Sequence, residues 1–113
     1  MTELTSLGAV IAHALELEQS LQVMARAAGD ARRAEASRQR GEELARIRRE
    51  AISEMILEPL SGIEAISLNG LSLDAATERL AAFYRDAADR MSIPDVARAL
   101  RRLGERTARI GPR

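Results

Sequence analysis

Residues 18–28, EQSLQVMARAA, line up with residues 78–88, ERLAAFYRDAA, and this internal match decides how the chain divides. A second match follows in the same order, between GEELARI at 41–47 and GERTARI at 104–110. Such repeats indicate one structural unit used twice, here a pair of helices. Chance similarity stays an alternative, because an Ala-, Arg- and Glu-rich chain aligns easily with itself. The offset also changes, from 60 residues (18 to 78) to 63 (41 to 104).

The composition favours close helix packing. A chain of 113 residues is one domain, predicted over 1–113. Its aromatic residues are Phe83 and Tyr84, so Leu, Ile, Val, Met and Ala must build the core. The absence of Cys excludes disulfides and thiolate metal sites. We therefore expect an all-α domain.

The sequence shows no targeting or membrane segment. No basic region followed by an apolar run opens the chain, as a signal peptide would require. No stretch approaches the roughly 18 apolar residues that cross a bilayer. We expect a soluble cytoplasmic protein with no membrane partner.

Apolar residues at spacings of three and four predict four helices. They cover about residues 5–28, 31–57, 73–90 and 94–110, with a linker at 59–72. Thr5 or Ser6, Asp30 and Ser72 are the expected N-caps, and Gly29 ends the first helix. The second helix is about 39 Å long, whereas fourteen extended residues reach up to about 46 Å. The linker can therefore return along the bundle. We predict a four-helix bundle of two similar hairpins with a long crossover between the second and third helices.

The charge balance is zero overall but uneven along the chain. Residues 1–25 hold three acids, and 26–49 hold eight Arg against four acids. Residues 50–78 hold six acids and no Arg, and 79–113 hold nine Arg against four acids. A zero total argues against a dedicated nucleic-acid binder. The alternating blocks indicate helices that attract one another, or two copies that pair.

Two segments resemble the ferritin-like superfamily. ALELE at 14–18 with MARAA at 24–28 is similar to the opening helix of rubrerythrin-like members. AFYRDAADR at 82–90 with IPDVARALRRL at 93–103 is similar to the Phe-Tyr-x-x-Ala-Ala segment and its following helix. The resemblance implies a duplicated hairpin with a central crossover.

The metal-ligand motifs of that superfamily are missing. Its chemistry needs an inward Glu on two helices and Glu-x-x-His on the other two. Here Ala45 and Ala108 stand where His is needed, and Glu42 and Glu105 lie opposite the apolar stripes. The chain therefore looks like a degenerate member without the dinuclear site, and no cofactor is predicted.

A noncanonical carboxylate site is the remaining metal hypothesis. Three of its candidates recur every four residues on the predicted second helix, and a fourth borders the stripe of the first helix. A solvated or dimer-facing stripe is the alternative interpretation. The candidates for iron or manganese are Glu18, Glu50, Glu54 and Glu58.

The lone histidine and tyrosine suggest packing roles. His13 lies at the flank of the first helix, where only Glu16 is close enough to share a metal. Tyr84 lies on an inner face and needs a partner for its hydroxyl. A hydrogen bond to Glu18 would supply one, although the internal alignment pairs Tyr84 with Met24 instead. No catalytic constellation or phosphate loop is visible, so the sequence favours a non-enzyme.

Arginines line one side of the fourth predicted helix and part of the second. A solvated face is the usual meaning, and pairing with the acidic 50–78 region is the next. Nucleic-acid contact is the third, although no stacking aromatics accompany them. The residues are Arg98, Arg101, Arg102, Arg106 and Arg109, with Arg32, Arg33, Arg38, Arg46 and Arg49.

These patterns favour a non-catalytic bundle that acts by protein–protein association, most simply as a homodimer or with another helical protein. This prediction rests on the broad apolar surface at the C-terminal end of the second predicted helix and at the start of the linker. The alternatives are a carboxylate-bound iron or manganese protein and an Arg-mediated nucleic-acid-binding or adaptor protein. The predicted interface residues are Ile52, Met55, Ile56, Leu57, Leu60 and Ile63.

Overall fold

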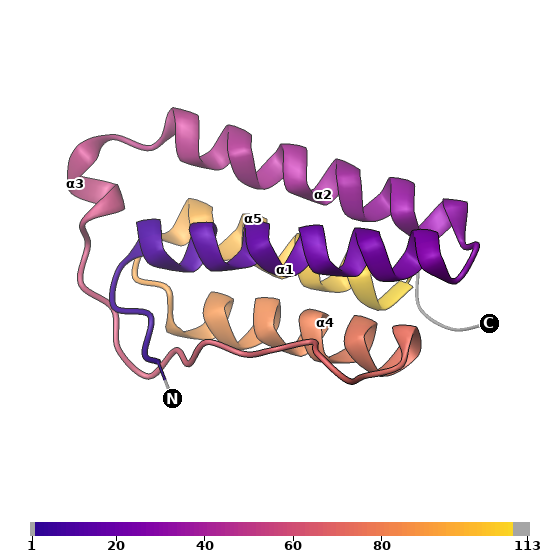
Figure 1. Ribbon diagram of the computed structural model, residues 1–113. Helices are drawn as coiled ribbons and strands as arrows, with labels where there is room; N and C mark the ends of the chain where they lie inside the picture. The colour runs from indigo at the N-terminus through magenta and orange to yellow at the C-terminus, as the bar shows by residue number, and fades with distance from the viewer. Residues whose placement is uncertain (1, 110–113) are drawn as a thin grey trace.

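The computed structural model describes residues 2–109, and its four long helices form one bundle (Figure 1). The helices of this part are α1 (Leu7–Ala27), α2 (Ala31–Glu50), α3 (Ser53–Ile56), α4 (Leu73–Arg90) and α5 (Pro94–Arg109). The molecule measures 41 × 28 × 18 Å. The predicted all-α bundle is confirmed. Ile110, expected at the end of the last helix, lies outside the described residues.

Most helix ends follow the predicted capping residues. The side chain of Ser6 accepts from the Ala9 amide, and Asp30 and Ser72 cap α2 and α4 in the same way. These oxygens satisfy amides that have no partner within the helix. Gly29 ends the first hairpin's turn with a φ of 74°, a conformation that costs glycine little. Pro94 opens α5, where its missing N–H is not needed.

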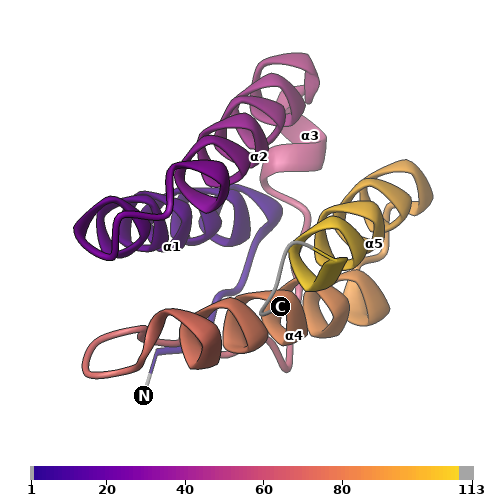
Figure 2. The same cartoon turned by 90° about the vertical axis from the view of Figure 1, so that its right-hand side faces the viewer.

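The chain order is two antiparallel hairpins joined by a crossover. α1 packs against α2 and α4 packs against α5 much more closely than the hairpins contact each other. Residues 57–72 run back along the bundle from the α3 end, so α4 points the same way as α2 (Figure 1). The predicted long crossover is confirmed. In the end view the long helices follow one another around the bundle in the order α2, α1, α4 and α5, so that α5 lies on the side opposite α1 (Figure 2).

The prediction of one continuous helix over 31–57 is wrong. α2 ends at Glu50, and Ala51 and Ile52 are extended, with ψ values of 134° and 165°. The short α3 then brings Ile56 against α1. A Cβ on Gly8 would lie only 2.9 Å from the Ile56 Cγ2, so a glycine permits this approach. A straight continuation of α2 would carry Ile56 away from the bundle.

The crossover is fixed to the first hairpin by backbone hydrogen bonds. The Leu4 amide donates to the Ile63 carbonyl at 2.8 Å, and the Leu60 amide donates to the Thr5 carbonyl at 2.9 Å. Leu60 and Ile63 are buried in the core. The linker is therefore a packed part of the bundle.

His13 on α1 forms a hydrogen bond with the middle of the crossover. Its Nε2 accepts from the Ile66 amide at 3.0 Å, which places the ring proton of a neutral imidazole on Nδ1. The ring meets Phe83 edge-on at 5.5 Å between centroids. Glu16 lies 3.8 Å from Nδ1 and is mostly exposed. The predicted boundary position of His13 is confirmed, and its polar atom has a structural partner.

Replacing His13 with Ala should free the crossover from α1. The Ile66 amide loses its acceptor, which costs about 1–3 kcal/mol in unfolding free energy. Urea unfolding measures this loss, and amide hydrogen exchange should show faster exchange at Ile66. His13→Phe keeps the ring contact and should accelerate that amide equally. An unchanged exchange rate at Ile66 in both variants would contradict this role.

Candidate functional site

A buried carboxylate joins the two hairpins. Glu18 on α1 is 2 % exposed. Arg40 on α2 donates from Nε to Glu18 Oε2 at 2.7 Å and from Nη2 to Oε1 at 3.1 Å. The Tyr84 hydroxyl on α4 donates to Oε2 at 2.6 Å. The Ser37 hydroxyl lies 2.7 Å from both Oε1 and the Glu18 carbonyl. Three helices thus converge on one carboxylate.

The hydrogen bond between Tyr84 and Glu18 is present although the internal alignment did not support it. The aligned pairs have different surroundings: Glu18 is buried whereas Glu78 is exposed, and Tyr84 is buried whereas Met24 is half-buried. The network is therefore not repeated in the second hairpin. Whether the repeat is a true duplication stays a prediction.

Arg40 is the member that sequence reasoning missed. Arginines on a polar helix half are expected on the solvated face, and Arg40 departs from this rule. The available signal was spacing, because Arg40 follows the inner-face Ser37 by three residues and precedes the buried Leu44 by four. The partner carboxylate is on another helix, so spacing alone does not identify the ion pair.

The environment of Tyr84 favours its neutral form. Burial raises the pKa of the hydroxyl well above its usual value, and the nearby Glu18 charge and hydrogen bond raise it further. The positive charges of Arg40 and Arg106 act in the opposite direction on this pKa but do not reverse it. The Tyr84 hydroxyl therefore remains a donor to Glu18 through the neutral pH range.

The network is enclosed within the bundle. Glu18 and Arg40 are each 2 % exposed, and Tyr84 is fully buried. Glu18 Oε2 accepts from Arg40 and Tyr84, and Oε1 accepts from Arg40 and lies beside the Ser37 hydroxyl, whose one proton is shared with the Glu18 carbonyl. A buried charge needs this degree of pairing to be tolerated. The arrangement leaves Glu18 with neither an open face for a substrate nor free lone pairs for a metal.

The other metal candidates do not lie together as the sequence suggested. Glu50 is the last residue of α2, whereas Glu54 lies in α3 and Glu58 follows it, so the helix break removes their shared stripe. Glu58 accepts from the Ser92 hydroxyl at 3.4 Å. Within residues 2–109, no three or more His, Asp or Glu side chains are grouped to hold a metal ion.

The predicted interface residues differ in how far their side chains are exposed to solvent. Ile52 is 57 % exposed and Leu57 is 72 % exposed, which is unusual for large apolar side chains. Leu60 and Ile63 belong to the core of the chain itself. The two half-buried members are Met55 and Ile56.

An open seam runs between α2 and α5. The two helices make almost no close backbone contact in the described chain, because the hairpins join through α1 and α4. A cavity of about 280 Å³ lies at the α3 end of this seam. Its apolar lining is Ile47, Ala51, Met55, Val96 and Ala99, and its charged lining is Glu43, Arg46, Glu50, Asp95 and Arg102.

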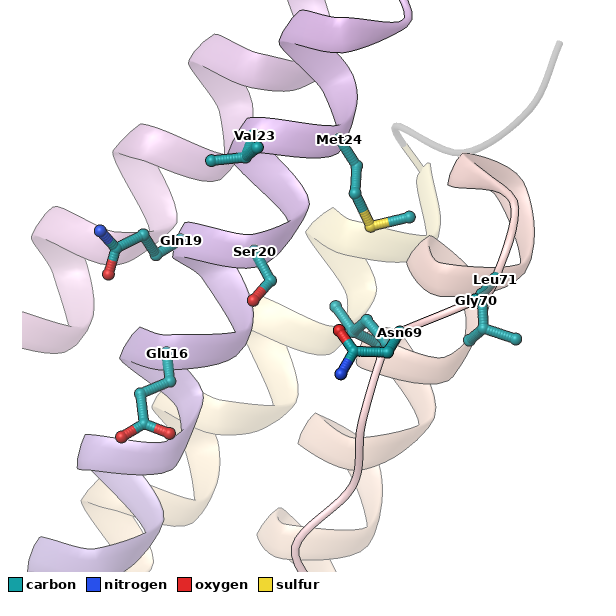
Figure 3. Close-up of a pocket in the computed structure, with 9 residues that line it drawn as sticks. Glu16, Gln19, Ser20, Val23, Met24, Asn69, Gly70 and Leu71 are labelled. Carbon is teal, nitrogen blue, oxygen red and sulfur yellow. The ribbon is translucent and has the colours of Figure 1, made fainter.

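A larger cleft lies on the other side of α1. It encloses about 570 Å³ between the outer face of α1 and the turn at 68–71. Figure 3 shows Met24 on α1 extending toward the side of the cleft where Asn69, Gly70 and Leu71 lie. Glu16 is the one acidic lining residue. The cleft is open to solvent, and its other polar lining residues are Gln19, Ser20 and Asn69.

Arg33 pairs with the acidic 50–78 region, and other arginines pair with acids elsewhere in the chain. Arg33 is buried and donates to Asp74 at 2.7 Å, which is a pair with the acidic 50–78 region. Arg101 donates to Asp89 at 2.9 Å across the second hairpin. Arg38 and Arg46 pair with glutamates of their own helix. Much of the Arg charge is therefore matched locally.

Comparisons with protein-family models, with curated proteins and with solved structures find no match to this chain. The ferritin-like resemblance therefore stays a prediction. None of the helices described is both long and apolar enough to cross a membrane.

Replacing Glu18 with Gln should destabilise the fold strongly. The change leaves the buried Arg40 charge uncompensated, which costs about 3–5 kcal/mol. Tyr84→Phe removes one donor to the carboxylate and should cost about 1–3 kcal/mol. Denaturant unfolding measures both. The matched control is Glu78→Gln, the exposed counterpart, which should change stability by less than about 0.5 kcal/mol. Equal effects of Glu18→Gln and Glu78→Gln would refute the role of the network.

Stability at high pH should report on Tyr84 alone. The chain has no Lys or Cys, and arginines stay charged, so Tyr84 is the side chain that titrates between about pH 9 and 12. Its folded pKa is raised, so its contribution is intact below the unfolded pKa of about 10 and is lost as pH rises above it. The expected slope is about 1.4 kcal/mol per pH unit. Tyr84→Phe should abolish the slope, and parallel losses in both proteins would contradict the assignment.

Proposed function

We propose that this chain is a non-catalytic helical bundle that works by protein–protein association, with a second copy of itself as the partner. The observation that carries the proposal is the exposed apolar pair Ile52 and Leu57, which flank α3, together with the seam cavity that Ala51 and Met55 of the same segment line. We call Ile52, Leu57 and the lining of the 280 Å³ cavity the seam surface. Exposed apolar groups at a concave surface are typical of interaction sites.

The charges of the seam surface favour a second copy as occupant. Three acids and two arginines lie around its apolar floor, so the surface carries both signs. In a twofold dimer the same patch meets itself, and residues of opposite sign from the two copies can face each other. A surface of one sign would repel its own copy. The zero net charge of the chain adds no long-range repulsion.

The ferritin-like relation and its metal chemistry are weaker candidates. The order of two hairpins and a crossover supports the relation. The engaged Glu18 carboxylate and the separated Glu50, Glu54 and Glu58 speak against a metal function. Association needs none of these groups, and it is therefore the function that the geometry supports best.

Charged substitutions at the seam surface should weaken the dimer. Ile52→Glu and Leu57→Glu place a carboxylate where apolar area would be buried, which should weaken association about tenfold or more. Sedimentation equilibrium over a concentration series measures the change. Both side chains are exposed, so the helical content should stay the same.

The matched control is Val23→Glu. Val23 is 59 % exposed, similar to Ile52, but it lies at the far end of α1 beside the other cleft. Its substitution should leave the dimer intact. A wild-type protein that is monomeric at every concentration up to about 0.1 mM would refute self-association, because that result corresponds to a binding free energy weaker than about −5.5 kcal/mol. Loss of the dimer in Val23→Glu alone would move the interface to the other cleft.

A further inference from the structure

The far end of the α2–α5 seam contains a second, separate cavity. It holds about 230 Å³ and is lined by Ala36, Gln39 and Arg40 of α2 with Arg106 and Arg109 of α5. Among residues 2–109, none that lines it is acidic. Three guanidinium groups and one amide thus surround a small hollow whose other neighbour is an alanine. This cavity differs from the 280 Å³ cavity, which has both charge signs.

Arg40 gives this cavity a rigid wall. Its side chain is 2 % exposed and is held by Glu18 through Nε and Nη2. Its Nη1 makes no hydrogen bond to any residue within 2–109. A guanidinium that is already fixed loses little conformational freedom when it binds, unlike an arginine that extends into solvent. Arg40 therefore presents a pre-oriented donor edge.

Arg106 and Arg109 add charge that the described chain does not neutralise. Neither forms an ion pair with any residue in 2–109, whereas Arg98 and Arg101 on the same helix pair with Asp95 and Asp89. Arg106 is also close enough to Tyr84 for its charge to act on that hydroxyl. Glu18 already neutralises Arg40, so Arg106 and Arg109 carry the positive charge at this cavity that has no partner within 2–109. An anion in the cavity would relieve their mutual repulsion.

We propose that the cavity formed by Arg40, Arg106, Arg109 and Gln39 binds a small phosphate-class oxyanion, either inorganic phosphate or the phosphate group of a small molecule. Guanidinium groups match the oxygens of phosphate through paired N–H donors. The Nε2 of Gln39 already donates one hydrogen bond to Glu35 Oε2 at 3.2 Å, and its second N–H can donate to the anion. The confined volume selects a compact anion over the extended backbone of a duplex. The site does not depend on the proposed dimer.

The test is a titration with inorganic phosphate at constant ionic strength, with sodium chloride as the balancing salt. Tyr84 is the one tyrosine and the chain has no tryptophan, so tyrosine fluorescence reports directly on the group beneath the cavity. We expect a saturable fluorescence change and a matching rise in the thermal unfolding midpoint. Free phosphate and a phosphate monoester, glycerol 2-phosphate, distinguish the two sources of the anion by their relative affinity.

Arg106→Ala and Arg109→Ala should each weaken phosphate binding about tenfold or more, because each removes a charge-assisted donor. Both side chains are exposed, so the fold should persist, as circular dichroism can verify. The matched control is Arg48→Ala on α2, which removes the same charge outside both seam cavities and should leave binding unchanged. The proposal is overturned by a signal that does not saturate, by an equal loss in Arg48→Ala, or by binding to duplex DNA without binding to phosphate.

Discussion

The carboxylate of Glu18 is the constraint on which the arrangement of the helices depends. A charge that is removed from water must be matched by donors, and here the donors come from α2 and α4. Leu- and Ala-rich helix faces can pack in several registers, since one apolar side chain replaces another at little cost. The hydrogen bonds to Glu18 are directional and accept one register. The contacts of α1 with α2 and with α4 are therefore fixed at this point.

The seam follows from this geometry. Arg40 reaches inward from α2 to Glu18, and Tyr84 reaches Glu18 from α4, so the hairpins join along α1 and α4. α2 and α5 face each other with few contacts, and cavities lie at both ends of the space between them. The cavity at the α3 end combines apolar side chains with charges of both signs. At the other end, the charged residues of 2–109 that line the cavity are all arginines. The interior holds the hairpins together, while the seam remains accessible for binding.

Much of the fold was readable from the sequence because its signals are local. Ser6, Asp30 and Ser72 cap helices through their own side chains, and the fourteen-residue linker is too long for a tight turn. The break after Glu50 was not readable, because Ala51 and Ile52 are neither Gly nor Pro and continue the apolar pattern. It depends on a tertiary contact between Ile56 and the space beside Gly8. The site was less predictable than the fold for the same reason. Arg40 and Glu18 are 22 residues apart and on different helices.

The central claim is that the seam surface is where two copies meet. The most direct measurement is an isotope-filtered NOE experiment on an equal mixture of labelled and unlabelled protein, which detects contacts between copies alone. The account predicts intermolecular NOEs from the methyl groups of Ile52, Met55 and Leu57, and from those of Ile47 and Val96. Intermolecular NOEs confined to Val23 and Leu71, or none at concentrations where the protein sediments as a dimer, would contradict it.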